Sequence, residues 1–279
     1  MIFLKRTLIL IFAALISCQN SKSGNTVAGN PYISLAMTGA STNATVLNIQ
    51  KRFNFFDLIF AKSFAFPAPS SMMDSAGNVV VLSQYWINLG SFEFEATESA
   101  TLDEIDGTNI DFQGPYPVNL LTSSPQILGS NSINLSQIRR IKAKLAMTLS
   151  VPTGAPSVFL GKSIYISGQV NGNNFTFSTN AESEVQVGGA TAITALSDKT
   201  MLLELRTANL IKKMNLSAIT TATNIDDSNK VNVVSPCSGI DVSASDLFSC
   251  FLKGLETESD LGRDDDGNFR IDATEEAIK

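Results

Sequence analysis

Twelve residues near the C-terminus carry the ligand pattern in this chain that is easiest to interpret chemically. They run from Asp264 to Glu275 and have the order Asp-Asp-Asp-Gly-Asn-Phe-Arg-Ile-Asp-Ala-Thr-Glu. Aligned with the EF-hand calcium loop, the residues at ligand positions 1, 3, 5, 7, 9 and 12 are Asp264, Asp266, Asn268, Arg270, Asp272 and Glu275. Position 7 offers a backbone carbonyl, and position 12 offers both oxygens of a carboxylate. Acids crowded this closely repel one another unless a cation neutralises them, so the pattern predicts a calcium site.

Two features of the loop depart from an EF-hand. Phe269 occupies position 6, where the sharp turn usually requires glycine, although Gly267 supplies some conformational freedom nearby. The flanking residues also lack the apolar periodicity of paired EF-hand helices. We therefore expect a solitary EF-like loop with an affinity of about 10⁻⁴–10⁻³ M. The alternative is a solvated acidic tail that binds nothing specifically.

The overall composition excludes several classes of chemistry. The 279 residues include no histidine, so Ser-His-Asp and Cys-His mechanisms, histidine metal ligands and an imidazole base are all absent. Lys and Arg number 20 against 26 Asp and Glu, a formal charge of −6 that argues against a nucleic-acid partner.

Two pairs of acids have the spacing that places both members on one face of a strand. They are Glu93 with Glu95 and Glu182 with Glu184. Paired carboxylates can act as acid and base in glycoside hydrolysis, which would make the protein a carboxylate-dependent hydrolase of envelope or extracellular polysaccharide. Because the acids alternate with apolar neighbours, we expect them instead on the solvent face of half-buried strands, and we predict no enzymatic activity.

The N-terminus has the organisation of an export signal. Lys5 and Arg6 precede an apolar stretch, residues 8–16, that is too short to span about 30 Å of hydrocarbon. This pattern predicts a secretory signal peptide over residues 1–17. The sequence Leu-Ile-Ser before Cys18 resembles a bacterial lipobox, which implies cleavage before Cys18 and attachment of lipid to this residue. The alternative is an ordinary signal peptide with an incidental cysteine.

Removal of the signal peptide changes the distribution of charge. Residues 18–30 are rich in Ser, Gly and Asn and are predicted to form a flexible tether. Loss of two basic residues with the leader brings the charge of the mature chain to −8, and −6 of this lies within residues 254–279. The acidity is therefore local to the C-terminus, and the rest of the mature chain is nearly neutral.

The body of the chain, residues 31–235, has the pattern of an all-β domain. Short alternating runs separated by turn residues predict an antiparallel β-sandwich, as in the immunoglobulin fold. The predicted strands are Tyr32–Met37, Val79–Leu82, Trp86–Phe94, Ile110–Phe112, Ile138–Leu149, Ser163–Val170, Asn174–Ser178, Val185–Val187 and Met201–Leu205. Asn171-Gly172 is a strong hairpin signal, and residues 207–216 are the best candidate for a helix in this region.

A phenylalanine-rich segment interrupts the strand pattern. Residues 53–66 contain six of the 17 phenylalanines and are followed by two prolines. One interpretation is a loop that contacts a membrane or a partner. The other, which we favour, is a helix or loop that closes one end of the sandwich by burying the rings.

Residues 236–279 are predicted to form a disulfide-linked helix followed by the acidic loop. Cys237 and Cys250 are the cysteines that remain after lipidation of Cys18, and an exported pair of this kind is expected to form one disulfide worth about 3 kcal/mol. The predicted helix is capped by Ser243 and ends at Gly254. Its apolar face is Leu247, Cys250 and Phe251.

Several short segments, or phrases, of the sequence resemble those of a family of bacterial surface lipoproteins from spirochaetes of the Leptospira type. The phrases are Met73–Gly77, Phe112–Leu121, Ser163–Gly168, Ala208–Lys212 and the acidic loop. More distantly, the chain is similar to transthyretin-like sandwich lipoproteins. The resemblance implies a fold and a location but no activity.

Together these features predict a lipid-anchored envelope protein. We expect an exported chain held in the bacterial envelope, in the outer membrane, by a covalent lipid on Cys18, exposed at either the surface or the periplasmic face. Its role would be that of a non-enzymatic binding or structural module with a weak calcium site and a protein or glycan partner. The hydrolase described above is the alternative.

Overall fold

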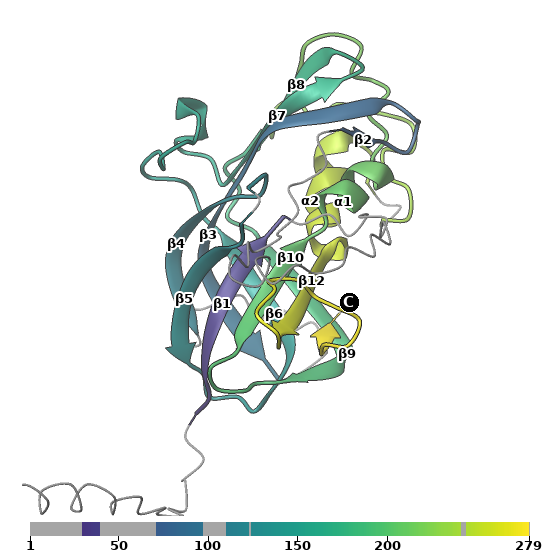
Figure 1. Ribbon diagram of the computed structural model, residues 1–279. Helices are drawn as coiled ribbons and strands as arrows, with labels where there is room; N and C mark the ends of the chain where they lie inside the picture. Colours follow the sequence, from purple (N-terminus) through teal and green to yellow (C-terminus); the bar gives the residue numbers. More distant parts are fainter. Residues whose placement is uncertain (1–29, 40–70, 97–109, 123, 241–243, 279) are drawn as a thin grey trace, which may run out of the picture.

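The computed structural model describes residues 30–39, 71–96, 110–122, 124–240 and 244–278. Most of these residues lie in two β-sheets, with two α-helices beside them (Figure 1). The predicted all-β, sandwich-like fold is confirmed. Cys18 and residues 53–66 lie outside the described residues. Within the described parts of the chain, the helices fall short of the length and hydrophobicity that a membrane span requires.

The five-stranded sheet has the order β13-β12-β10-β1-β5. Its strands are β1 (Tyr32–Thr38), β5 (Gln126–Ser132), β10 (Thr200–Leu205), β12 (Ser259–Asp264) and β13 (Ala277–Ile278). Two of the five come from the C-terminal 30 residues, so this region belongs to the sandwich itself rather than forming an appendage. In Figure 1 the yellow C-terminal strand β12 lies beside the green strand β10.

The larger sheet has the order β11-β8-β7-β3-β6-β9, with β2 and β4 also paired to β3. Its strands are β2 (Met72–Met73), β3 (Val79–Glu95), β4 (Phe112–Asn119), β6 (Gln137–Leu145), β7 (Ile164–Val170), β8 (Asn173–Thr179), β9 (Glu184–Thr194) and β11 (Thr223–Ile225). Most pairs are antiparallel as predicted, but β1 with β10 and β8 with β11 are parallel.

Strand β3 is a single element where the sequence predicts two strands. It pairs with β7 through its first half and with β6 through its second half. The register shifts at Ser83 and again at Gly90, as expected for bulges that bend a long strand. The first bulge, at Ser83, lies in the predicted break between the two strands, whereas the second, at Gly90, lies inside the predicted strand Trp86–Phe94.

The hairpin between β7 and β8 forms where Asn171-Gly172 predicts it. The two turn residues have φ values of 48° and 85°. Positive φ at both central residues is the requirement of a type I′ turn, which favours Asn followed by Gly. The strands pair without interruption from Ile164 opposite Thr179 to Val170 opposite Asn173.

Two helices, α1 (Thr207–Lys213) and α2 (Leu247–Thr257), pack on the core. The predicted apolar face of α2 is confirmed, since Leu247, Cys250 and Phe251 are all buried. The cap is Asp246, whose carboxylate accepts a hydrogen bond from the Ser249 backbone N–H at 2.7 Å. The predicted cap, Ser243, lies outside the described residues.

The predicted end of α2 at Gly254 is wrong, because the helix continues to Thr257. Gly254 faces α1, where an added Cβ atom would lie 2.1 Å from Leu210 Cδ1. The glycine therefore allows two helices to approach closely and does not end one of them.

Candidate functional site

The acidic loop connects β12 to β13 as the turn of an irregular hairpin. The two strands pair antiparallel, with Leu261 opposite Ile278 and Gly262 opposite Ala277. The flanks are therefore strands, which differs from the helix–loop–helix of an EF-hand. Because both arms are held in a sheet, the loop begins and ends at fixed positions.

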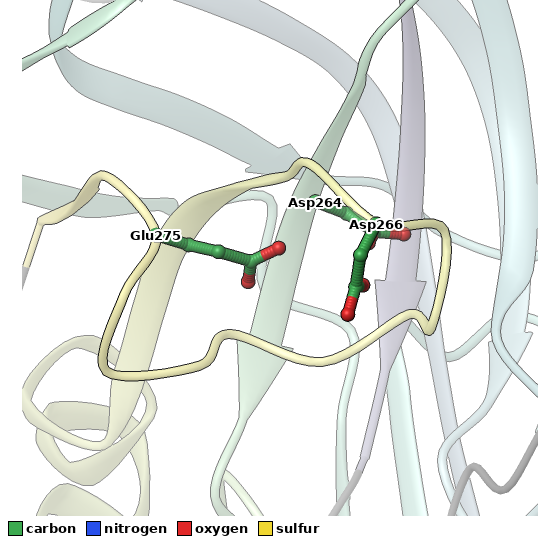
Figure 2. A group of neighbouring side chains, drawn as sticks. All are labelled: Asp264, Asp266 and Glu275. Carbon is green, nitrogen blue, oxygen red and sulfur yellow. The ribbon is translucent and has the colours of Figure 1, made fainter.

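Three carboxylates meet inside this loop. Ligand oxygens of Asp264, Asp266 and Glu275 all lie within 4.8 Å of one another. Figure 2 shows the Glu275 side chain reaching across the loop from one arm toward the two aspartates on the other. Asp264 is the last residue of β12 and is buried, whereas Asp266 is exposed and Glu275 is half-buried. The predicted residues at positions 1, 3 and 12 are thus brought together.

The Asp264 carboxylate organises the turn that follows it. Its Oδ1 accepts hydrogen bonds from the backbone N–H groups of Gly267 at 2.8 Å and Asn268 at 3.1 Å. Its Oδ2 accepts one from the backbone N–H of Phe269 at 3.0 Å. A carboxylate oxygen has two lone pairs, so Oδ2, which accepts a single hydrogen bond, retains one for a cation.

Glu275 is oriented in the same way from the returning arm. Its Oε1 accepts a hydrogen bond from the Asp265 backbone N–H at 2.7 Å, and its Oε2 accepts one from the Asp272 backbone N–H at 2.9 Å. These bonds join the two arms and hold the glutamate toward the centre of the loop.

The turn forms in spite of the residue at position 6. Phe269 has a φ of 57° and Gly267 a φ of 76°. Left-handed backbone is costly for a residue that carries a Cβ atom, and the surrounding hydrogen bonds have to maintain it. The departure that the sequence indicates at Phe269 therefore appears as local strain within an otherwise EF-like turn.

The remaining predicted ligands surround the Asn268 amide. Its Nδ2 donates to Asp266 Oδ2 at 2.9 Å and to Asp272 Oδ2 at 2.7 Å, and its Oδ1 accepts from the Arg270 backbone N–H at 2.8 Å. Asp272 is not a member of the three-carboxylate group. Of the four acids predicted as ligands, the structure therefore brings three together and ties the fourth to Asn268.

The pKa values of Asp264 and Asp265 are shifted in opposite directions. Burial raises the pKa of Asp264, and the neighbouring charges of Glu275 and Asp266 raise it further against the backbone hydrogen bonds that lower it. Arg263 contacts the two carboxylate oxygens of Asp265 at 2.6 and 2.9 Å and lowers the pKa of this residue. Arg263 thus pairs with Asp265 and with none of the three converging carboxylates.

Gly262 is a residue of this site that the sequence analysis missed. A Cβ atom at this position would lie 2.7 Å from Ile271 Cγ1, so the glycine lets Ile271 pack directly on strand β12. A glycine inside a strand is the available signal for such a close approach.

The prediction that Glu93 and Glu95 face solvent is wrong. Glu93 is buried and lies 3.6 Å from the Lys142 Nζ atom, and Glu95 contacts Lys142 at 2.7 Å and Arg140 at 3.0 Å. The β3–β6 register sets Glu93 opposite Lys142 and Glu95 opposite Arg140, so the acids form cross-strand ion pairs. Burial raises the pKa of Glu93, although Lys142 opposes the shift.

The two members of the second acid pair, Glu182 and Glu184, lie in different surroundings. Glu182 is exposed, whereas Glu184 lies on β9 and borders an open depression of about 230 Å³ between β9 and α2. Glu256 of α2 borders the same depression beside Lys253. Desolvation raises the pKa of Glu256, and the hydrogen bond from the Gln186 backbone N–H and the charge of Lys253 partly offset this effect.

The predicted cysteine pair is bonded. Cys237 and Cys250 form a disulfide whose Cα atoms lie 5.6 Å apart. Cys250 is fully buried on α2, so the bond joins this helix to the segment that precedes it.

No protein family, curated protein or solved structure matches the chain. The resemblance to spirochaete lipoproteins therefore stays a prediction.

Proposed function

We propose that the protein is a lipid-anchored, non-enzymatic module of the bacterial envelope whose C-terminal loop binds a calcium ion. The observation that carries the calcium assignment is the convergence of Asp264, Asp266 and Glu275 inside a loop held at both ends by a sheet. The lipid anchor rests on the lipobox before Cys18.

Calcium suits this loop because its ligands are hard oxygens in an irregular arrangement. The ion takes six to eight oxygens in flexible geometry, whereas magnesium requires a near-ideal octahedron. The three carboxylates would hold it, and the Arg270 carbonyl with Asn268 and Asp272 are the further oxygens of the loop. With strained backbone at Phe269, we expect an affinity of about 10⁻⁴–10⁻³ M.

Bound calcium would act mainly on the stability of the loop and its strands. It would neutralise the three converging acids, and it would cross-link the end of β12 to the returning arm. A ligand present at ten times its dissociation constant stabilises the folded state by about 1.4 kcal/mol. This effect would stiffen one end of the sandwich.

The test is a calcium titration of the mature protein, followed by calorimetry and by thermal melting. We expect binding heat and a rise in melting temperature for the unchanged protein and for the control Glu182→Gln, which removes one exposed acid elsewhere. Asp266→Asn should weaken binding at least about tenfold, and Asp264→Ala/Glu275→Ala should abolish it. Identical heats and melting shifts for all four proteins would refute the calcium site.

The anchor is tested separately. Cells that express the full chain are grown with a palmitate analogue, and the purified protein is examined for label. We expect label on the unchanged chain and none on Cys18→Ala. Absence of label from the unchanged chain would overturn the lipoprotein assignment without affecting the calcium site.

The proposal that the module is non-enzymatic rests on two observations. The sequence contains no histidine, and Glu93 and Glu95 are engaged by Lys142 and Arg140. A protein or glycan partner at the cell surface or in the periplasm remains part of the proposal. Protease treatment of intact cells, with a periplasmic protein as control, distinguishes the two locations, because only a surface-exposed domain would be cleaved.

A further inference from the structure

The loop between β6 and β7, residues 146–163, exposes aliphatic side chains at a projecting point of the molecule. Figure 1 shows it as the teal segment that extends away from the sheets at the upper left. Leu149 is 86% exposed, Val158 is 56% exposed and Leu160 is 54% exposed. Met147 and Val151 are also exposed, and the sequence has no charged residue from Leu145 to Gly161. This is an apolar surface of the kind that marks an interaction site.

A buried aromatic contact and two backbone hydrogen bonds fix the conformation of the loop. Phe159 is fully buried, and its ring centroid lies 6.0 Å from that of Trp86. The Thr148 N–H donates to the Lys162 carbonyl at 2.9 Å, and the Gly161 N–H donates to the Thr148 carbonyl at 2.8 Å. These two bonds join the arms of the loop, and Leu149 and Leu160 are the first and last residues beyond this closure.

The backbone of the loop satisfies many of its own donors. Three backbone hydrogen bonds of 3.0–3.2 Å close turns within it. Their donors are the N–H groups of Ala155, Phe159 and Leu160, and their acceptors are the carbonyls of Pro152, Pro156 and Ser157, respectively. The two prolines carry no N–H group. Unsatisfied backbone groups are what exclude irregular loops from apolar surroundings, so these bonds lower the cost of entry.

The chemistry of the exposed side chains distinguishes between two kinds of partner. Binding hot spots on proteins are enriched in Trp, Tyr and Arg, with Leu and Val under-represented. The exposed apolar side chains of this loop are Leu, Val and Met, and the other exposed side chains are the small uncharged ones of Ser150, Thr153 and Ser157. Leu and Val are favoured in the hydrocarbon of a bilayer. A projecting shape also enters a bilayer surface without a matching groove. We propose that the β6–β7 loop inserts Leu149, Val158 and Leu160 into the surface of a lipid bilayer.

The insertion would be shallow. Interfacial segments bury their apolar side about 5–10 Å into the boundary between headgroups and acyl chains. Lys144 and Lys162 are the charged residues that bracket the loop in the sequence, and they would remain among the headgroups.

The test uses residues 18–279 with Cys18→Ser, so that no lipid anchor contributes. Flotation with phosphatidylcholine vesicles, with and without phosphatidylglycerol, measures the partition coefficient. The loop variant is Leu149→Asp/Leu160→Asp. The matched control is Val234→Asp, which places a charge at another apolar side chain that is 88% exposed.

We expect the unchanged chain and Val234→Asp to float with both kinds of vesicle, and the loop variant to partition at least about tenfold less. Failure of the unchanged chain to float with either kind, or equal flotation of the loop variant, would overturn the proposal. Trp86 is the single tryptophan and lies against Phe159, so its emission reports whether the loop variant is folded. If that emission changes, Leu149→Ser/Leu160→Ser takes its place and is expected to partition less in the same way.

Discussion

The direction in which successive acids point decides the chemistry of the C-terminal loop. Asp264 and Asp266 converge with Glu275, whereas Asp265 pairs with the buried Arg263. Three consecutive aspartates thus differ in their roles, since Asp265 joins the loop to Arg263 of β12 and the other two are the candidate ligands. The strained residue in this arrangement is Phe269.

Phe269→Gly should tighten calcium binding. Glycine adopts φ near +57° without the cost that a Cβ atom imposes, so less binding energy is lost in maintaining the turn. We expect the affinity to rise by about two- to tenfold, which corresponds to about 0.4–1.4 kcal/mol. Calorimetric titration measures this change. Phe269→Ala is the control, because it removes the same ring but retains the Cβ atom, and an equal gain in both variants would contradict the strain argument.

A second single residue, Asp111, gives a prediction about pH. Burial raises its pKa, although its Oδ2 accepts a hydrogen bond from the Phe94 backbone N–H at 2.7 Å. The folded state therefore holds the proton more tightly than the unfolded state, and stability falls as pH rises from the ordinary aspartate pKa through the raised one.

Asp111→Asn should stabilise the protein at pH 7 and have less effect at pH 3. Asparagine resembles the protonated acid, and its amide oxygen can still accept the hydrogen bond from Phe94. Urea unfolding of both proteins at the two pH values measures the difference. A variant that is relatively less stable at pH 7 than at pH 3 would show that the charged form of Asp111 stabilises the fold.

Among the elements, α2 shows how packing overrides a local signal. A glycine near the end of an amphipathic run is a common helix terminus, yet α2 continues for three residues beyond Gly254 because α1 packs against it there. A side chain at position 254 would force the buried Leu210 side chain to move.

Gly254→Ala should destabilise the protein in spite of the higher helix propensity of alanine. The new Cβ atom would meet Leu210 Cδ1 at 2.1 Å and Ile240 Cδ1 at 3.2 Å. Such overpacking typically costs about 1–3 kcal/mol in the free energy of unfolding. Chemical denaturation tests this, with Thr257→Ala in the last turn of the same helix as a control that we expect to lie within about 0.5 kcal/mol of the unchanged protein. A stabilised Gly254→Ala protein would mean that the helices can separate at little cost.

The whole molecule depends on contacts that join its two sheets. Glu276, just before β13, accepts a hydrogen bond from the Thr194 backbone N–H of β9 at 2.5 Å and one from Arg263 Nη1 at 2.8 Å. The same Arg263 atom donates to the Thr194 carbonyl at 2.7 Å. These three residues link the larger sheet to the five-stranded sheet beside the acidic loop.

Glu276→Ala should weaken this link between the sheets. It leaves the Thr194 N–H without its acceptor and removes one of the partners of Arg263. We expect a loss of about 1–2 kcal/mol in the free energy of unfolding, measured by denaturant titration. Glu182→Ala, which removes an acid from an exposed position, should change it by less than about 0.5 kcal/mol. Equal stability of the two variants would show that the sheets are held together without Glu276.

Strand β12 illustrates why part of the fold could not be predicted. Its residues, Ser-Asp-Leu-Gly-Arg-Asp, have the composition of a loop, yet all six are buried. Strands on both sides cover them, and Arg206 forms an ion pair with the buried Asp260. Charged residues are buried only when a partner compensates them, and the partner is supplied by a distant part of the chain.

The sequence by itself determined the features that depend on neighbouring residues. Period-two alternation located β1, β7, β8 and β10, Asn-Gly set the type of one hairpin, and the i, i+3, i+4 spacing identified the buried face of α2. The ligand pattern of the acidic loop could also be predicted, because all of the candidate ligand oxygens belong to twelve consecutive residues.

The tertiary structure alone decided which of these residues meet. It placed the acidic loop between two strands, turned Glu275 toward Asp264 and buried Glu93 against Lys142. Such contacts depend on strand register and on the packing of segments far apart in the chain. Their energies come from burial and from cross-strand pairing, which no short stretch of sequence contains.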